Sequence, residues 1–204
     1  MMTNSKMKSR NLVLLSVKPA KTVEEFVDHW RAYYQYGDSE RYSFNIRARE
    51  FTPTNLRELY HWKNGMTLEG SGTKEKSLEK KITSKTKKIN QFKLAKRVDL
   101  DAFNKEFANI SAVWRIFLLH IIKPKVYPMY DQHVHRSYLF IHGFDWSNIH
   151  NKISNEKKLQ FYFDSYLPFI KQLRYSNLKG LDEALFAFGQ YLNIRKQGRN
   201  LLKS

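Results

Sequence analysis

The chain contains no cysteine and no long apolar run. Without cysteine, its 204 residues can form no disulfide, no cysteine-ligated zinc site and no iron–sulfur cluster. This composition suits the reducing interior of a cell. The apolar run at residues 12–17 is too short for a signal peptide or a membrane span. We therefore expect a soluble, cytoplasmic protein with no membrane contact.

Acidic residues are scarce relative to basic ones. Asp and Glu number 19 against 36 Lys and Arg, which gives a formal net charge of +17. A field of this sign concentrates polyanions, so nucleic acid is the first partner that it indicates. An anionic membrane surface or an acidic protein would produce the same bias.

Apolar and aromatic residues, in contrast, are abundant. Hydrophobic residues make up 42% of it and aromatic residues 15%, including 12 Tyr and 14 Phe. This is enough for one buried core, or for two small helical lobes that share a cleft. The aromatic count serves core packing and base stacking equally well.

Helical patterns dominate the first half. Residues 12–17 form either a buried strand or a helical turn that Pro19 ends, and Thr22 begins a helix that runs to Gly37. Residues 42–51 show no regular pattern, and Thr54 is expected to cap a short helix over 55–62.

The most basic segment is 70–97, which contains ten Lys or Arg residues and only two acidic residues, Glu75 and Glu79. The simplest interpretation is a solvated helix whose apolar residues, Leu78, Ile82, Ile89 and Phe92, point inward. Contact with phosphates is compatible with that arrangement.

The second half is also helical. We expect a helix over 100–107 capped by Asp99 or Asp101, a tight turn at 108–111, and an apolar helix over 110–122 bounded by Pro124. Further helices are expected from near Asp131 to Gly143, over 156–173 and over 181–194. The fold class is therefore all-α or nearly so.

Two short motifs carry the functional information. Residues 107–111 read Phe-Ala-Asn-Ile-Ser between two helices, and residues 130–136 read Tyr-Asp-Gln-His-Val-His-Arg. The pair resembles the helix-hairpin-helix DNA glycosylases, which carry a Leu-Pro-Gly-Val-Gly hairpin, a helix, and then Val-Asp-Thr-His-Val-x-Arg with the catalytic Asp. Residues 120–131, from His-Ile-Ile-Lys-Pro to Tyr-Pro-Met-Tyr-Asp, look like the small bacterial relatives of 8-oxoguanine glycosylases.

This resemblance implies a two-lobed helical fold with a cleft between the lobes, and excision of a damaged or modified base flipped out of double-stranded DNA. Residues 1–99 would form an N-terminal helical part with the basic segment, 100–151 the hairpin and the aspartate segment, and 152–204 helices that pack back on the N-terminal part. It also implies a monomer without cofactor or metal, associated with the nucleoid of a bacterial cell.

Asp131 matches the family's catalytic aspartate, whose carboxylate stabilises the oxocarbenium-like sugar that forms as the base departs. The same alignment places Val113 where bifunctional members keep a Schiff-base lysine. Its absence implies a monofunctional enzyme that leaves an abasic site, although Lys105 or Lys123 could reach the sugar from elsewhere.

The remaining site residues follow from the same resemblance. Those expected to contact DNA are Asn109, Ile110, Ser111, Ala112, Arg115, Lys123, Lys125 and Arg136. Those expected to surround the everted base are Trp114, His120, Tyr127, Tyr130, Gln132 and His133.

Other interpretations stay open at this point. Asp131 could be a simple helix cap worth about 1 kcal/mol, and Trp114 and Tyr130 could be core residues. The hairpin lacks both family glycines, which favours a DNA-binding protein of this fold without catalysis. A basic adaptor for an acidic protein is the third possibility. The sequence does not reveal which base would be removed, nor whether the role is repair or attack on modified phage DNA.

Overall fold

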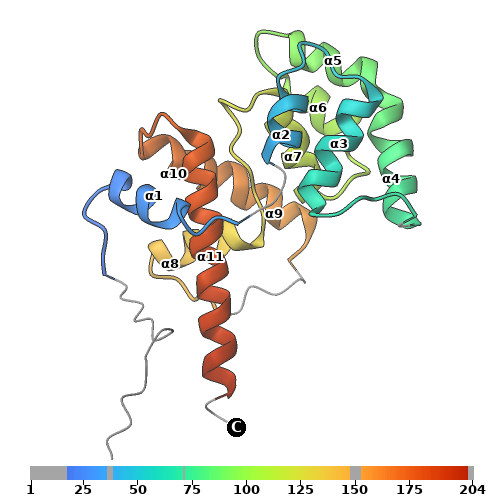
Figure 1. Ribbon diagram of the computed structural model, residues 1–204. Helices are drawn as coiled ribbons and strands as arrows, with labels where there is room; N and C mark the ends of the chain where they lie inside the picture. Colours follow the sequence, from blue (N-terminus) through green and yellow to red (C-terminus); the bar gives the residue numbers. More distant parts are fainter. Residues whose placement is uncertain (1–17, 36–38, 71, 148–152, 202–204) are drawn as a thin grey trace, which may run out of the picture.

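The computed structural model describes residues 18–35, 39–70, 72–147 and 153–201; the apolar run at 12–17 lies outside them. The described residues form helices and no strand, which confirms the all-α prediction (Figure 1). In chain order the helices are α1 (Val23–Arg31), α2 (Ser39–Ile46), α3 (Pro53–Asn64), α4 (Thr73–Lys81), η1 (Thr83–Lys85), α5 (Thr86–Leu94), α6 (Leu100–Glu106), α7 (Ala112–Ile122), α8 (Gln132–Ile141), α9 (Asn155–Phe161), η2 (Tyr162–Tyr166), α10 (Leu167–Gln172) and α11 (Leu178–Leu201).

Helix starts in the first half follow side-chain capping. The Thr22 hydroxyl accepts the Glu25 N–H as predicted, although α1 ends at Arg31 rather than at Gly37. The prediction for the third helix was wrong by two residues, because Thr52 and Asn55 form a reciprocal capping box with Pro53 in the first turn.

The expectation of irregular structure over 42–51 was wrong for its first half, since α2 extends to Ile46, and residues 47–51 are not helical. The helical period of α2 is hard to read because few apolar residues face the core. Tyr42, 5% exposed, is held by a hydrogen bond from its hydroxyl to buried His120 of α7, a tertiary contact without a local sequence pattern.

The basic segment contains α4, the short 3₁₀ turn η1 and α5 rather than one helix. Its four apolar residues are buried, which confirms the inward face predicted for Leu78, Ile82, Ile89 and Phe92. The break falls where the Thr83 hydroxyl donates to the Glu79 carbonyl and the Thr86 hydroxyl to the Thr83 carbonyl, because such side-chain bonds compete with regular helix geometry.

Helices α6 and α7 form the predicted helix–turn–helix. Asp99 caps α6 as expected, and Ser111 caps α7, which begins two residues later than predicted. The Arg115 guanidinium donates to the carbonyls of Ala108 and Ile110 and so fixes the turn from within.

The C-terminal half differs mainly in helix boundaries. The helix predicted over 156–173 is α9, η2 and α10, with a π-helical turn just before Pro168, which lacks the N–H that an α-helix would use there. The last helix, α11, starts earlier than predicted and contains Gly180 and Gly189.

Figure 1 shows α2 to α7 gathered on one side, α1, α8, α10 and α11 on the other, and α9 between them. Helix α11 packs against α1 and α8, α2 against α3, and α7 against α5 and α9. None of the helices in the described ranges combines the length and apolar character that a membrane crossing requires.

Candidate active site

Asp131 caps the N-terminus of α8. One carboxylate oxygen, Oδ1, accepts the backbone N–H groups of His133 and Val134 at 2.8 and 2.9 Å. The other, Oδ2, lies 3.8 Å from the Lys63 ammonium of α3, and the Asp131 side chain is 20% exposed. The Asp131 carboxylate is thus surrounded by two N–H donors, the N-terminus of a helix and an ammonium ion.

The residues just before Asp131 are anchored in the core. The Met129 N–H donates to Asp182 Oδ2 at 2.9 Å, and the Tyr130 hydroxyl bonds to His135 Nδ1 at 2.8 Å. These contacts fix the segment that carries Asp131 between α7 and α8.

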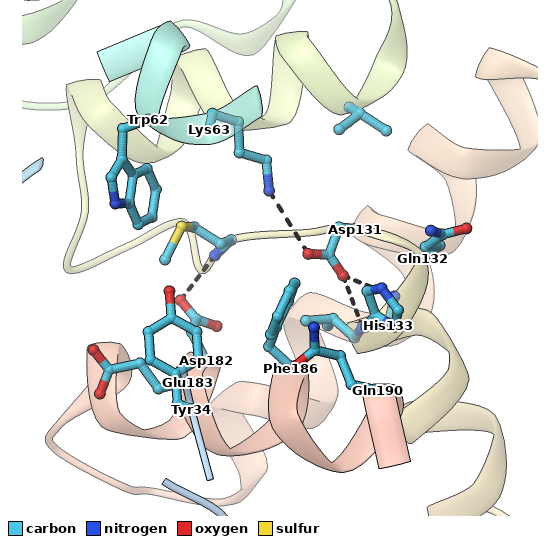
Figure 2. Close-up of a pocket in the computed structure, with 13 residues that line it drawn as sticks. Tyr34, Trp62, Lys63, Asp131, Gln132, His133, Asp182, Glu183, Phe186 and Gln190 are labelled. Carbon is cyan, nitrogen blue, oxygen red and sulfur yellow. Dashed lines mark hydrogen bonds and ion pairs between the residues drawn. The ribbon is translucent and has the colours of Figure 1, made fainter. Parts of the chain in front are cut away.

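A cavity of about 360 Å³ lies beside Asp131; we call it the Asp131 cavity. Its polar and charged lining residues are Lys63, Asp131, Gln132, His133, Asp182, Glu183 and Gln190. Its apolar and aromatic lining residues are Tyr34, Trp62, Val113, Met129, Val134 and Phe186. In Figure 2, Lys63 points from α3 toward Asp131, while Asp182, Glu183 and Phe186 come from α11.

Asp182 is a second carboxyl group in this cavity. It is 3% exposed, and burial raises its pKa to about 8, against the lowering effect of hydrogen bonds from the Met129 N–H and the Tyr166 hydroxyl. At neutral pH it is therefore mostly protonated. The adjacent Glu183 instead faces basic partners, with Arg31 Nε at 2.7 Å and Lys179 Nζ at 3.7 Å.

No family model, no curated protein and no solved structure matches this chain. A functional assignment must therefore come from the residues themselves.

Among the residues predicted to surround a base, Gln132 and His133 line the Asp131 cavity. His133 packs edge-on against Phe186, and its Nδ1 accepts a hydrogen bond from Arg136. Because arginine can only donate, the proton of the neutral imidazole lies on Nε2. Burial lowers the pKa of His133, which favours this neutral form.

The other four residues predicted for the base pocket lie elsewhere. His120, Tyr127 and Tyr130 are 3%, 8% and 3% exposed and belong to the core, and none of them lines the Asp131 cavity. His120 bonds to the Tyr127 carbonyl, and burial lowers its pKa to about 4. Trp114 is partly buried, in edge contact with Tyr60, and lines a different cavity.

That second cavity, of about 300 Å³, lies between the hairpin and the basic helix α4, and we call it the Trp114 cavity. It is lined by Thr73, Lys74, Ser77, Lys81, Ile110, Ser111 and Trp114. Lys81 also donates to the Asn109 carbonyl at 2.9 Å. The basic segment and the hairpin are separate in the sequence, but the fold places them side by side.

Several predicted DNA contacts turn inward. Arg115 and Arg136 are buried, and Arg136 Nη1 bonds to His133 and to the Gly189 carbonyl, so it joins α8 to α11. The Lys123 ammonium donates to the carbonyls of Lys93 and Ala95, where it caps the C-terminus of α5. One Nη of each arginine and the Lys123 ammonium are thus engaged with the protein itself.

The hairpin itself is only partly available. Ile110 and Ala112 are buried, and the Ala112 N–H is taken by Asn155 Oδ1 of α9 at 2.9 Å. Asn109, Ser111 and Lys125 remain exposed. Any phosphate contact made here has to use those three and the α4 lysines.

Sequence reasoning missed Lys63 and all the cavity residues that α11 contributes, which are Asp182, Glu183, Phe186 and Gln190. Asp182 did leave a trace, since it and Glu183 interrupt an apolar stretch between Leu181 and Ala184. Lys63 left none, because only the packing of α3 against the 129–131 segment brings it to Asp131. Within the described ranges, no group of three or more His, Asp or Glu side chains is arranged to bind a metal ion.

Proposed function

We propose that this protein is a DNA glycosylase of the helix-hairpin-helix type, with Asp131 as its catalytic carboxylate. The observation that carries the proposal is that Asp131, held by two N–H donors at the start of α8, lies on the wall of a cavity of about 360 Å³. Cavities of this size accommodate small molecules. The two sides of Figure 1 would then be the two lobes of the fold, and the Asp131 cavity is lined by residues from both sides, such as Lys63 of α3 and Asp182 of α11.

The lining of the cavity suits an everted nucleotide. Tyr34, Trp62 and Phe186 offer aromatic surface for a base, and Gln132 and Gln190 offer amide groups for hydrogen bonds. As the glycosidic bond breaks, positive charge develops on the deoxyribose, and the Asp131 carboxylate stabilises it.

The two carboxyl groups would act in opposite protonation states. Asp131 serves as the anion, and the protonated Asp182 is a hydrogen-bond donor for a ring nitrogen or oxygen of the leaving base. Pairs of titratable groups in contrasting environments are typical of acid–base sites. The exposed Asn109, Ser111 and Lys125 and the α4 lysines would hold phosphates on either side.

Replacement of Asp131 by Asn tests this proposal. Asparagine caps helices as well as aspartate does, so the fold should persist while the negative charge is lost. With duplexes carrying oxidised, alkylated, deaminated or otherwise modified bases, followed by alkali, we expect base release by the wild type and a loss of at least about 100-fold in Asp131→Asn. DNA binding should remain.

Asp99→Asn is the matched control, because Asp99 caps α6 in the same way through the Ala102 N–H and does not line the Asp131 cavity. It should leave base release unchanged. Equal rates in wild type and Asp131→Asn would exclude the mechanism. Binding of duplex DNA without release of any tested base would instead support a DNA-binding protein that lacks catalysis.

A further inference from the structure

Lys63 is a residue of the Asp131 cavity that the sequence pattern gave no reason to select. It lies near the end of α3, and its side chain is only 12% exposed although lysine is usually solvated. The contacts of its ammonium include Asp131 Oδ2 at 3.8 Å, the Tyr130 carbonyl at 3.4 Å and the face of Phe117 at 5.8 Å. The amine is therefore directed at the catalytic carboxylate.

Val113, where the family's lysine would stand, lines the same cavity from α7. Among the described residues of this cavity, Lys63 is the one that carries an amine. Of the other lysines considered from the sequence, Lys105 is exposed on α6 and Lys123 caps α5, and neither lines the cavity. The space opposite Asp131 thus receives an amine from α3 instead of from α7.

We infer that Lys63 is a catalytic nucleophile that forms a Schiff base with C1′ of an abasic deoxyribose and cleaves the strand on its 3′ side. This inference rests on the proposed function, because it assigns a second reaction to the same cavity. It differs from the expectation of a monofunctional enzyme. That expectation followed from the absence of a lysine at position 113, and Lys63 would supply the amine instead.

The chemistry uses groups already in place. The ammonium gives one proton to water, and the neutral Nζ adds to the C1′ aldehyde of the ring-opened sugar; the carbonyl oxygen leaves as water and a protonated imine remains. The Asp131 carboxylate then accepts a proton from C2′, the C2′–H electrons form the C2′–C3′ double bond, and the C3′–O bond breaks with its electron pair leaving on the phosphate. Hydrolysis of the imine releases the unsaturated aldehyde and restores Lys63.

The test supplies the abasic site directly, so it does not depend on which base the protein removes. The full chain is incubated with a duplex containing one abasic site, with and without sodium borohydride, which reduces an imine to a stable amine. We expect a strand break without alkali, a covalent protein–DNA adduct with borohydride, and the adduct mapped to Lys63 by mass spectrometry of the digested protein.

Lys63→Arg retains the positive charge opposite Asp131 but removes the nucleophilic amine, since guanidinium stays protonated. Strand cleavage and adduct should fall at least about 100-fold, with binding to the abasic duplex within about threefold of wild type. Lys105→Arg is the matched control and should behave as wild type. It is needed because exposed lysines of a basic protein also react slowly with aldehydes.

The outcomes separate the two proposals. An adduct at another lysine, or undiminished cleavage by Lys63→Arg, overturns the role of Lys63. Base release that depends on Asp131, without any borohydride adduct, refutes the lysine inference and leaves the glycosylase standing. An adduct at Lys63 without release of any base supports the inference and leaves the glycosylase without support. Mapping on the wild type decides the matter even where a variant folds poorly.

Discussion

At the scale of single residues, the buried carboxyl of Asp182 should make its own contribution to the pH dependence of stability. Its pKa is raised from an ordinary 3.8 to about 8 because it lies in the core. Between these values Asp182 holds a proton in the folded protein that it has lost in the unfolded chain, so its contribution to the free energy of unfolding falls as pH rises, by up to about 1.4 kcal/mol per pH unit. Buried histidines such as His120, whose pKa is lowered, act in the opposite direction below about pH 6.5, so the contribution of Asp182 is measured as a difference between variant and wild type.

Asp182→Asn removes the titrating carboxyl group, and with it the contribution of this group to the pH dependence of stability. Urea unfolding at pH 5, 6 and 7 should show the stability of the variant rising relative to wild type by about 1 kcal/mol for each pH unit. Asp101→Asn, which removes an exposed carboxylate from α6, is the control for a change of charge alone. A constant difference between Asp182→Asn and wild type across this range would show that Asp182 is already ionised in the folded protein at pH 5.

Residue by residue, the sequence predicted the capping positions near the site better than the cavity itself. Asp131 lies at a helix start and His133 and Gln132 lie beside it, because caps and first turns depend on local chemistry. His120, Tyr127 and Arg136 have side chains equally suited to a base pocket or to a core, and only tertiary packing decides between them. Lys63 and Asp182 come from helices far from the motif in sequence.

At the scale of elements, α8 and α11 approach each other closely at Gly189. A Cβ atom on Gly189 would lie 2.0 Å from the backbone oxygen of His133, so only glycine allows the two helices to approach this far. The same contact includes the bond from Arg136 to the Gly189 carbonyl. The position of the Asp131–His133 turn therefore depends on α11.

Gly189→Ala should separate α8 from α11 and destabilise the fold by about 1 to 3 kcal/mol, the usual range for an overpacked contact. It should also reduce base release, since Asp131 and His133 move with α8. Gly180→Ala in the same helix is the control: its Cβ would meet only the Asn177 side chain. Rotation of that side chain breaks the hydrogen bond that Asn177 Oδ1 accepts from the residue 180 N–H, a cost of about 1 kcal/mol that the helix preference of alanine largely offsets. Urea unfolding curves that shift equally for both variants would contradict this account of the contact.

Helix type was predictable for most elements and helix boundaries were not. The apolar α7 and the capped α6 follow from composition and local signals, whereas α2 depends on the contact between Tyr42 and His120. The break between α4 and α5 depends on threonine hydroxyls that bond back to the chain, and such bonds alter helices without a change in hydrophobic period.

At the scale of the whole molecule, the net charge of +17 should make DNA binding steeply dependent on salt. Binding of a basic protein to duplex DNA releases condensed counterions, and each phosphate contact contributes about −0.9 to the slope of log K against log salt concentration. The structure places Lys74 and Lys81 beside Ser111 at the Trp114 cavity, so we expect these α4 lysines to make such contacts.

Titration of a labelled duplex at about 50 to 200 mM salt measures this slope. Lys74→Ala and Lys81→Ala should each weaken binding equally across unrelated sequences and make the slope shallower by about 1. Lys171→Ala, which removes an exposed charge from α10, lowers the net charge by the same amount away from that cavity and should leave the slope within error of wild type. If all three variants changed the slope alike, the attraction would arise from the overall field, and α4 would not be a specific phosphate-binding helix.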